Sequence, residues 1–388
     1  MLIPYCLNIH PGESLAATCE AIERYALAVK EQVAPACPYP LGLRLSASAA
    51  AELAEPSALC ALRDLLARHA CYVTDINGFP YGNFHGAPVK AAVYQPDWST
   101  PERLTYTGRL AVILAELLPA ERSGNISSVP LGYKKALADQ QKTVVVRQLA
   151  VVAEFLNDLK LKTGREVVLA LEPEPDCCLE SVDDVIAWYE DELLVEGRRW
   201  LTANRRRTAD EAEALLRRYV GVCLDTCHMA VIFEDPLTAL NRYASAGIRV
   251  ARIQLSAALR TTLADESITQ LSKFIDPVYL HQTKLRRPQG QLLAWPDLTP
   301  ETLAEARKYK GCELRTHFHV PLFYNGDAVL GSTHDELTKE FFASAQKQAI
   351  PMEIESYTFD VLPPELRAAD VVASLVNEYR WLSQQSEL

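Results

Sequence analysis

Two apolar stretches of the sequence each end in side chains that can bind a cation or move a proton. Residues 220–224 run directly into Asp225, which is followed three residues later by His228. A second apolar run ends in Glu172 and Glu174. A buried strand has no need of charged groups at its end, and desolvating them is costly unless they have a partner, of which a divalent metal is the strongest common one. The two stretches therefore predict a metal site at one end of a set of parallel strands.

A pair of histidines, His317 and His319, adds imidazole groups to this set. The two residues lie in an otherwise largely apolar run and are two positions apart, so both point to the same side if the run is a strand. That spacing suits two ligands of a metal. The other interpretation is that both histidines hydrogen-bond to carboxylates across the interior.

The segment 351–356 alternates apolar and acidic residues. Met352 and Ile354 share one face of the expected strand, and Glu353 and Glu355 share the other. If helices cover the outside, the two carboxylates point inward, where they need a cation or an arginine to stay ionised. The candidate counter-ions for Glu353 are Arg44 and Arg315. Glu355 is nearer the end of the strand and is the better candidate for a metal ligand.

The predicted metal site combines carboxylates and imidazoles. Its expected ligands are Glu172, Asp225, His317, His319 and Glu355. Such a mixed set suits Mn, Zn, Co or Fe, whereas a site made only of oxygen ligands would suit Mg better. We therefore expect a divalent metal cofactor of one of these kinds, acting as a Lewis acid on adjacent oxygen atoms of a substrate.

Three further side chains are predicted to act in catalysis. Glu174 and His228 are candidates for moving a proton as a general base, and Lys90 for contacting a polar substrate. Lys90 lies in the segment 77–98, whose glycines and aromatic residues suit a lid over the site. The other interpretation of this segment is a loop whose aromatic side chains form its own small core. The predicted substrate-binding residues are His10, Asn77, Phe79, Tyr81, His85 and Gln254.

Apolar strand-like runs alternate with helical patterns along the whole chain, which favours βαβ units and a parallel sheet. The expected strands lie near 3–9, 41–45, 71–76, 125–129, 167–171, 220–224, 250–255, 313–319 and 351–356. The helical patterns lie near 14–33, 48–69, 101–118, 134–163, 181–195, 236–246, 299–309, 334–349 and 365–385. About eight such units predict an α/β fold of the (β/α)8 TIM-barrel type, in which 313–319 and 351–356 compete for the eighth place. No GxGxxG motif follows the first strand, which argues against a dinucleotide-binding fold.

The domain organisation is predicted to be simple. The chain has 388 residues with no linker, repeat or low-complexity tract, so we expect a single domain over 1–388. Three long segments interrupt the pattern, near 77–100, 196–219 and 256–298. The first and third follow strand ends and so belong to the C-terminal face of the barrel, where long loops are usually lids or binding loops. The middle segment, rich in Arg and Glu, should extend the ring of helices.

The composition argues against several classes of partner. The net charge of −11 is a poor match for nucleic acid or anionic lipid. No apolar run approaches the ~20 residues of a membrane span, and the first residues show no signal-peptide pattern. Ten cysteines occur without a CxxC pair, which indicates reduced thiols. We therefore predict a cytoplasmic protein that binds a small-molecule metabolite, with no nucleic-acid partner and no membrane span.

Two segments, 222–228 and 171–175, resemble the metal-ligand strands of the xylose-isomerase-like barrel superfamily. That superfamily contains sugar isomerases, sugar-acid epimerases and endonuclease IV. The string Cys-Leu-Asp-Thr-Cys-His is especially similar to endonuclease IV, and this resemblance implies zinc binding by Asp225 and His228.

One position departs from the pattern of that superfamily. In the epimerases the seventh strand ends in a metal-binding histidine, whereas Gln254 stands nearest that place here, and a neutral Gln is a weak ligand. Either the ligand shell is rearranged, or His317 or His319 supplies the missing imidazole. The three zinc ions of endonuclease IV need more histidines than these strands provide, and its DNA-binding loops would conflict with the acidic charge.

A closer resemblance covers nearly the whole chain. Its motifs include 5–13, 41–45, 77–82, 84–86, 130–133, 254–258, 317–321 and 353–358. They are similar to the EboE family, barrel proteins of the Ebo cluster, which is associated with moving secondary-metabolite precursors. The resemblance implies a xylose-isomerase-like fold, a role in metabolite traffic and secondary metabolism, and other Ebo-cluster proteins as partners. It implies no particular reaction.

Three functions are compatible with these features. The first is a metal-dependent isomerase or epimerase that acts next to a carbonyl of a small sugar-like metabolite or secondary-metabolite precursor. The second is a metal-dependent phosphoester hydrolase related to endonuclease IV, which predicts two or more metals. The third is a non-catalytic metabolite carrier, which predicts ligand binding that survives Glu172→Gln and Asp225→Asn.

Overall fold

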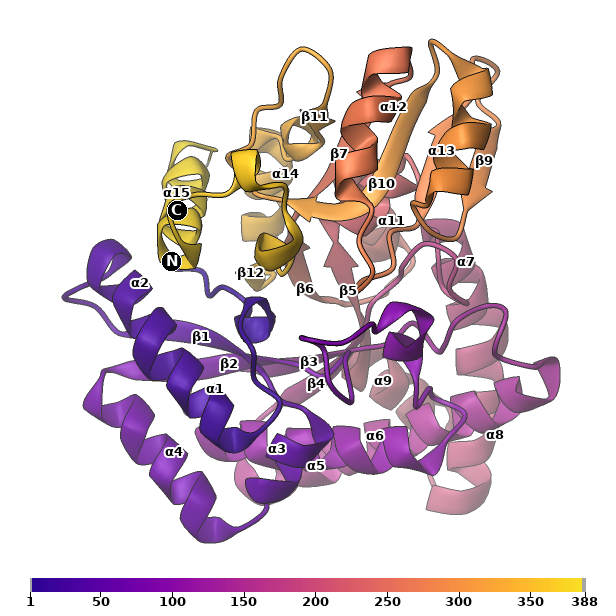
Figure 1. Cartoon of the computed structure of the whole chain (residues 1–388). Coiled ribbons are helices and arrows are strands. Elements are labelled where there is room, and N and C mark those ends of the chain that lie inside the picture. The colour runs from indigo at the N-terminus through magenta and orange to yellow at the C-terminus, as the bar shows by residue number, and fades with distance from the viewer. Residues whose placement is uncertain (1, 386–388) are drawn as a thin grey trace.

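The centre of the molecule is a ring of parallel strands (Figure 1). The computed structural model describes residues 2–385. Seven strands are hydrogen-bonded in the order β1, β2, β3, β4, β5, β6 and β12, and every neighbouring pair is parallel. Their bounds are β1 Tyr39–Arg44, β2 Cys71–Asn77, β3 Gly124–Ser128, β4 Val167–Leu171, β5 Val220–Asp225, β6 Val250–Leu255 and β12 Met352–Ile354. The predicted α/β barrel is therefore confirmed.

The N-terminal segment closes the ring between its last and first strands. Tyr5 pairs in parallel with Ile354 of β12, and Cys6 pairs in parallel with Gly42 of β1. Only this short part of the strand predicted over 3–9 is paired, because a 3-10 helix follows directly. The barrel is closed by two bridges instead of a full strand.

An antiparallel sheet stands beside the barrel, in orange at the top of Figure 1. Its strands are hydrogen-bonded in the order β11, β7, β10, β8 and β9. Their bounds are β7 Ala257–Thr262, β8 Thr283–Arg286, β9 Leu292–Trp295, β10 Glu313–Val320 and β11 Gly331–Ser332. The candidate strand 313–319 therefore belongs to this second sheet, and β12 takes the last place in the barrel. Three of the five strands come from the segment 256–298, which the sequence predicts as a long insertion on the C-terminal face.

Helices surround the barrel, and most of them begin at a residue whose side chain caps the first turn. In the first half of the chain they are α1 Leu15–Ala21, α2 Leu27–Val33, α3 Ala47–Glu52, α4 Pro56–Arg68, α5 Pro101–Leu117, α6 Lys142–Thr163, α7 Val182–Trp188 and α8 Leu194–Arg205. In the second half they are α9 Ala209–Tyr219, α10 Thr226–Val231, α11 Pro236–Ser245, α12 Asp265–Leu271, α13 Pro300–Ala306, α14 Lys339–Lys347 and α15 Val371–Gln385. The segment 196–219 forms most of α8 and all of α9, and both helices pack on α6. Within residues 2–385, no helix combines the length and the apolar character that crossing a membrane requires.

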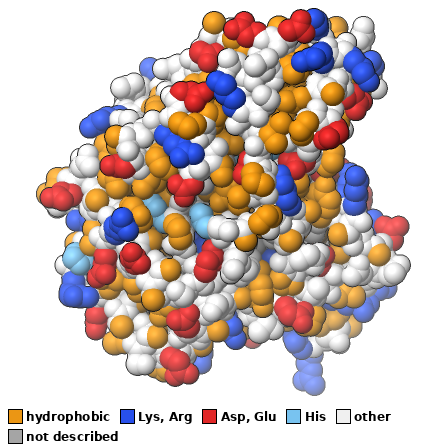
Figure 2. Space-filling model, viewed as in Figure 1, with side chains coloured by type: hydrophobic (Ala, Val, Ile, Leu, Met, Phe, Trp, Pro, Cys, Tyr) orange, Lys and Arg blue, Asp and Glu red, His pale blue; other side chains and the backbone are white. Residues whose placement is uncertain are grey.

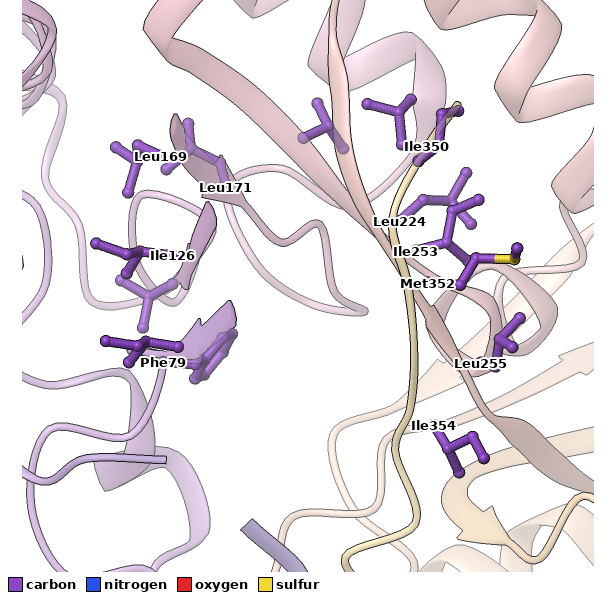
Figure 3. Close-up of a cluster of buried hydrophobic side chains, with 14 of the residues drawn as sticks. Phe79, Ile126, Leu169, Leu171, Leu224, Ile253, Leu255, Ile350, Met352 and Ile354 are labelled. Atoms are coloured by element: carbon purple, nitrogen blue, oxygen red, sulfur yellow. The ribbon is translucent and has the colours of Figure 1, made fainter. Parts of the chain in front are cut away.

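The outward faces of the barrel strands form the hydrophobic core (Figure 3). Met352 and Ile354 are buried and lie with Ile253 and Leu255 of the neighbouring β6, to which β12 is paired. Each such side chain contributes ~1.5–3 kcal/mol on burial. The alternation in the sequence therefore assigns these apolar residues to the correct face, which leaves the acidic residues of β12 for the interior.

The inward carboxylate of Glu353 pairs with Arg252 of β6, with 3.0 Å between Nη1 and Oε2, and both side chains are fully buried. A side chain at Gly42 would not fit here, because its Cβ would lie 1.7 Å from Oε1 of Glu353. The prediction that Arg44 or Arg315 is the counter-ion is wrong. Arg44 lies at the end of β1 and pairs with Glu13, whereas Arg315 lies in the second sheet and pairs with Glu313 and Glu336. Arg252 reaches Glu353 because their strands are adjacent, which a single sequence does not reveal.

Candidate metal centre

The strand β5 delivers Asp225 to the C-terminal end of the barrel, where it also caps α10. Its Oδ1 atom accepts hydrogen bonds from the backbone N–H of His228 at 3.0 Å and from the hydroxyl of Ser256 at 2.7 Å. Its Oδ2 atom is buried and has no hydrogen-bond partner within residues 2–385. The backbone therefore orients one oxygen of this carboxylate and leaves the other free for a ligand.

Three carboxylates meet at this point. Oxygen atoms of Glu172, Asp225 and Glu355 all lie within 4.8 Å of one another. Oε1 of Glu355 accepts hydrogen bonds from the side-chain amides of Asn8 at 2.7 Å and Asn77 at 3.1 Å. Oε2 of Glu172 is buried and, in the part of the chain that the structure describes, has no partner. Burial raises the pKa of Glu172 to about 8 and that of Glu355 well above its ordinary value. The neighbouring carboxylates raise both pKa values further, because like charges oppose each other's ionisation.

Three imidazoles stand against these carboxylates. Nε2 of His317 lies 3.1 Å from Nε2 of His228 and also 3.1 Å from Nε2 of His319. The rings of His228 and His319 come from different parts of the fold, since α10 follows a barrel strand and β10 belongs to the second sheet. The irregular pairing of β10 with β7 between Thr316 and His319 is a bulge of the kind that re-aims side chains near a site.

The other nitrogen of each ring fixes its tautomer. Nδ1 of His228 lies 2.9 Å from the carbonyl oxygen of Pro173, and Nδ1 of His319 lies 3.0 Å from that of Glu355. Nδ1 of His317 lies 2.7 Å from Oε1 of Gln282. A carbonyl oxygen carries no proton, so all three Nδ1 atoms must be the N–H donors. In the neutral rings each Nε2 atom therefore has a lone pair and no proton. Nε2 of His317 faces the Nε2 atoms of the other two rings.

A proton cannot relieve both of these contacts. Burial lowers the pKa of His228, but the charges of Asp225, Glu174 and Glu172 raise it overall, so this ring can donate a proton to His317. Burial lowers the pKa of His319 to about 4 and that of His317 well below its usual value, so the contact between these two rings stays between lone pairs. A cation bound by the Nε2 atoms removes this conflict.

The amide of Gln282 links the imidazoles to a fourth carboxylate. Its Nε2 donates to the carbonyl oxygen of Pro175 and to Oε1 of Glu174, both at 3.1 Å, which fixes Oε1 toward His317. The hydroxyl of Tyr94 donates to the same oxygen of Glu174 at 2.7 Å. Burial raises the pKa of Glu174 despite these hydrogen bonds. Hydrogen bonds of this kind orient ligands and proton-moving groups in metal sites.

The donor set fits a divalent cation. In each of four groups, three ligand atoms lie within 4.8 Å of one another, so small side-chain shifts would bring all three to the 2.0–2.3 Å that ligands of one metal require. The groups are Glu172, Asp225 and Glu355; Glu174, His228 and His317; Asp225, His228 and His319; and Cys227, His317 and His319. The free oxygens of the first group and the bare nitrogens of the others are the ligand atoms that such a cation requires.

A small cavity of about 50 Å³ opens above these groups. Its outer wall is the segment 77–98 together with residues from the second sheet and from the end of β12. Phe84, Tyr279 and Tyr357 pack as a cluster, with ring centroids 5.0–5.3 Å apart. In Figure 2, histidine side chains are visible between hydrophobic ones near the middle of the face shown. The site is therefore a covered pocket with aromatic walls.

The structure brings together all five predicted metal ligands and both predicted proton-moving groups. Each of these side chains belongs to at least one of the four groups above. Asn77, Phe79 and Lys90 line the cavity. The ammonium group of Lys90 is held 2.7 Å from Oδ2 of Asp297 and accordingly faces a partner from the second sheet.

Four predicted substrate-binding residues lie elsewhere. His10 hydrogen-bonds to the hydroxyl of Tyr5 and stacks on Tyr25. Tyr81 packs on Tyr106, and His85 lies beside Glu13. Gln254 is fully buried in the barrel, where its Oε1 accepts a hydrogen bond from the thiol of Cys223. None of these four side chains is among those that line the cavity.

Sequence reasoning did not assign a role to Gln282, Tyr357 or Asn8. Gln282 and Tyr357 touch His317, and Asn8 holds Glu355. Asn8 has a sequence signal, since it is a polar residue at the end of an apolar run. Gln282 has none beyond its place in a long insertion on the C-terminal face.

No family model and no curated protein matches the chain. Among solved structures, it is similar to the probable 3-DHS dehydratase AsbF from Bacillus anthracis, with 12% identity over 99% of each chain and a TM-score of 0.49. It is also similar to the IolI protein with a bound zinc atom, with 13% identity over 100% of each chain and a TM-score of 0.49. A third is the 3-keto-D-glucoside 4-epimerase YcjR from E. coli, with 13% identity over 99% of each chain and a TM-score of 0.44. At scores below 0.5, the chemistry of the site has to be derived from this chain's own side chains.

Proposed function

We propose that the protein is a metal-dependent barrel enzyme that isomerises or epimerises a small metabolite at a carbon next to a carbonyl. The observation that carries the proposal is the contact of Nε2 of His317 with Nε2 of His319 at 3.1 Å. Nδ1 of each of these two rings faces an oxygen acceptor, so their Nε2 lone pairs face each other, and buried carboxylates lie beside them. A divalent cation accounts for both features.

We assign the cation to the ligands expected from the sequence, which belong to separate groups of three neighbouring ligand atoms. Glu172, Asp225 and Glu355 supply carboxylate oxygens, and His317 and His319 supply imidazole nitrogens. When bound, such a cation polarises adjacent oxygen atoms of a substrate and lowers the cost of charge that develops on them. Asn8 and Asn77 keep the carboxylate of Glu355 in place through its Oε1 atom.

Glu174 and His228 are the groups that would move a proton. Both are buried at the floor of the cavity, and Glu174 is oriented by Tyr94 and Gln282. Burial raises the pKa of Glu174, and neighbouring carboxylates raise that of His228 above its ordinary value. Two neighbouring groups whose pKa values are both raised above their ordinary values can hold and exchange protons, which suits the removal of a proton from a substrate carbon and its return.

The cover over the cavity supports chemistry that requires the exclusion of water. The backbone N–H groups of Val89 and Lys90 donate to the carbonyl oxygen of Val278, so the lid segment is tied to the loop that precedes β8. A covered, low-dielectric site strengthens the electrostatic interactions within it.

The EboE resemblance extends the proposal. Several of its motif residues, among them Asn77, Phe79 and Glu355, line the cavity. On this basis we place the substrate among precursors of secondary metabolites and assign other Ebo-cluster proteins as partners and xylose-isomerase-like enzymes as relatives. A cytoplasmic location stays a prediction from the sequence.

A phosphoester hydrolase is the second candidate function. The group Glu172, Asp225 and Glu355 shares no residue with the group Glu174, His228 and His317, so two cations have separate ligands. Paired cations are the usual means of stabilising both oxygens of a phosphoryl displacement.

Two assays separate these functions. Protein loaded with Mn, Co or Zn is incubated in D2O with hydroxyketones such as dihydroxyacetone, and exchange of the C–H next to the carbonyl is followed by NMR. The proposal predicts exchange that is lost in Glu174→Gln while the metal remains bound. Release of p-nitrophenol from bis(p-nitrophenyl) phosphate without any C–H exchange would favour the hydrolase, and binding without either reaction would favour a carrier.

A further inference from the structure

The cavity above the candidate metal centre has a polar floor and an apolar wall. The floor side chains are Asn8, Asn77, Glu172, Glu174, His228, His317 and Glu355. The wall side chains are Phe79, Pro80, Phe84, Val89, Lys90, Val93, Tyr94, Tyr279, Leu280 and Tyr357. The acidic and imidazole groups follow the ends of barrel strands or lie in β10, whereas most of the apolar side chains come from the segment 77–98 and from the loop before β8.

Most polar side chains of the wall already have partners, and the exception is the hydroxyl of Tyr279, which makes no hydrogen bond within residues 2–385. The hydroxyl of Tyr94 donates to Glu174 at 2.7 Å. The ammonium group of Lys90 contacts Oδ2 of Asp297 and the carbonyl oxygen of Asp276, both at 2.7 Å. The hydroxyl of Tyr357 lies 3.4 Å from Nε2 of His317 and so belongs to the floor network. A substrate hydroxyl that points to the wall finds few free groups there.

The amide of Asn77, at the edge of the floor, is also committed. Its Nδ2 donates to Glu355 at 3.1 Å, and its Oδ1 accepts the backbone N–H of Phe79 at 3.1 Å. A substrate hydroxyl that displaced either bond would leave a buried group of the protein unpaired. Asn77 therefore offers no spare group to an extra hydroxyl, and the spare acceptor on the floor is Oδ1 of Asn8, which is buried without a partner within residues 2–385.

Burial of a hydroxyl without a hydrogen-bond partner is unfavourable, and the penalty is repeated for each such group. A polyhydroxylated ring carries hydroxyls around its whole edge, so several of them would face Phe79, Phe84, Val89 or Val93. A ring with oxygen atoms on one side only avoids this penalty. Its apolar part then packs against the aliphatic and aromatic side chains of the wall, which is favourable.

We propose that the substrate of this pocket is polar at one end only, with two adjacent oxygen atoms on an otherwise apolar ring or short chain. A polyhydroxylated sugar does not fit this description, which revises the sugar-like substrate expected from the sequence. That the two oxygen atoms of the substrate lie at the floor of the cavity depends on the proposed function. That further hydroxyl groups are excluded depends only on the side chains of the wall.

The test compares two ligands with the same six-membered ring. One is cis-cyclohexane-1,2-diol, with two adjacent hydroxyls, and the other is myo-inositol, with a hydroxyl on every carbon. Dissociation constants are measured by ligand-observed NMR on Zn-loaded protein and on metal-free protein. The proposal predicts at least tenfold tighter binding of the diol to the loaded protein. Equal or tighter binding of inositol, or binding of neither ring at millimolar concentration, would overturn it.

A variant of the wall tests the reason for the preference. Val93→Thr replaces a methyl group with a hydroxyl of nearly the same size, and should improve inositol binding relative to diol binding several-fold. Val112→Thr is the matched control, because Val112 is 43% exposed on α5 and does not line the cavity. An unchanged ratio in Val93→Thr would contradict the role of the wall.

The proposed metal-dependent function and the proposed substrate class can be refuted separately. If the protein binds no metal but still prefers the diol, the proposed function fails and the substrate class stands. If the metal binds and inositol is preferred, the metal-dependent function stands and the substrate class fails. Metal content measured on the same samples decides which case applies.

Discussion

Nε2 of His317 lies 3.1 Å from Nε2 of His228, although one residue lies in a strand of the second sheet, the other in the helix α10, and they are 89 positions apart. His228 follows the barrel strand β5, and His317 lies in β10 of the antiparallel sheet. Because each Nδ1 atom is bound to an oxygen acceptor, the contact joins two acceptors unless a cation or an extra proton intervenes. The inserted sheet therefore completes a centre that the barrel alone leaves short of imidazole.

Removal of one of these imidazoles should weaken metal binding strongly. We expect His317→Ala to lower the affinity for Zn at least ~100-fold, since loss of even an outer-shell partner typically costs 10–100-fold. Competition with a chromophoric chelator measures the affinity. His69→Ala, at an exposed position, is the control and should leave it unchanged. Equal affinities in both variants would remove His317 from the ligand set.

The amide of Gln282 should matter without touching the metal. In Gln282→Leu the side chain keeps a similar size, but His317 loses the acceptor at 2.7 Å that fixes its tautomer. We expect the metal affinity to fall ~10–100-fold with the fold intact by circular dichroism. Gln291→Leu, on an exposed turn of the same insertion, is the matched control. A wild-type affinity in Gln282→Leu would show that the tautomer is fixed in another way.

Metal affinity should rise with pH. In the metal-free protein burial raises the pKa of Glu172 to about 8, so this carboxyl is mainly protonated at pH 6 and must lose its proton to bind a cation. Affinity is therefore expected to increase between pH 6 and pH 8 and to be lost as the pH falls. Calorimetric titrations in buffers of different ionisation enthalpy should detect proton release. Binding that is independent of pH over this range would contradict the assignment.

Glu378 should make the metal-free protein less stable as the pH rises. This side chain of α15 is fully buried and accepts hydrogen bonds from Leu322 and Ser356, and burial raises its pKa to about 7. A folded pKa above the ordinary 4.5 means that the folded state binds more protons between pH 4.5 and pH 7, so the free energy of unfolding falls across that window. At ~1.36 kcal/mol per pKa unit, this contribution is at most about 3 kcal/mol.

The variant Glu378→Gln tests this contribution. It keeps an acceptor oxygen for both hydrogen bonds and cannot ionise, so its loss of stability from pH 5 to pH 8 should be smaller than that of the wild type. Urea unfolding at both pH values measures the difference. Glu365→Gln, on an exposed residue, serves as control and should follow the wild type. An identical pH dependence in Glu378→Gln would show that Glu378 does not titrate in this range.

The lid should loosen when Glu13 is removed. Oε1 of Glu13 accepts the backbone N–H groups of Phe84 at 2.9 Å and His85 at 3.3 Å, and Oε2 pairs with the buried Arg44 at 2.8 Å. In Glu13→Ala we expect hydrogen exchange to rise over residues 83–90 and substrate affinity to fall. Glu20→Ala, which removes an exposed carboxylate from α1, should change neither. Exchange at the wild-type rate would show that the lid is held by the loop that precedes β8 alone.

Local patterns predicted the parts of the site that depend on neighbours in sequence. The alternation over Met352–Ile354 placed Glu353 and Glu355 inside the barrel, and the run before Asp225 located the end of β5. The spacing of His317 and His319 identified a ligand pair although it did not show that their strand belongs to a second, antiparallel sheet.

The parts that escaped prediction depend on contacts between distant segments. Arg252 reaches Glu353 because β6 and β12 are neighbours, and Gln282 reaches His317 because β8 and β10 are paired. Strand order and register are set by the packing of the whole barrel and of the inserted sheet. A single sequence contains no local pattern that reports them, so counter-ions and orienting groups appear only in the structure.

Metal content tests the central claim most directly. Purified protein is stripped with a chelator, incubated with Zn, Mn or Co, passed through a desalting column, and measured by mass spectrometry of the metal and by thermal unfolding. We expect at least one divalent cation per chain and a higher unfolding temperature, since ligand at a hundredfold excess over Kd stabilises by about 2.7 kcal/mol. Both effects should be lost when Asp225→Asn is combined with His319→Ala. Absence of bound metal in the wild-type protein, with no change in unfolding temperature for any of the three ions, would contradict the claim.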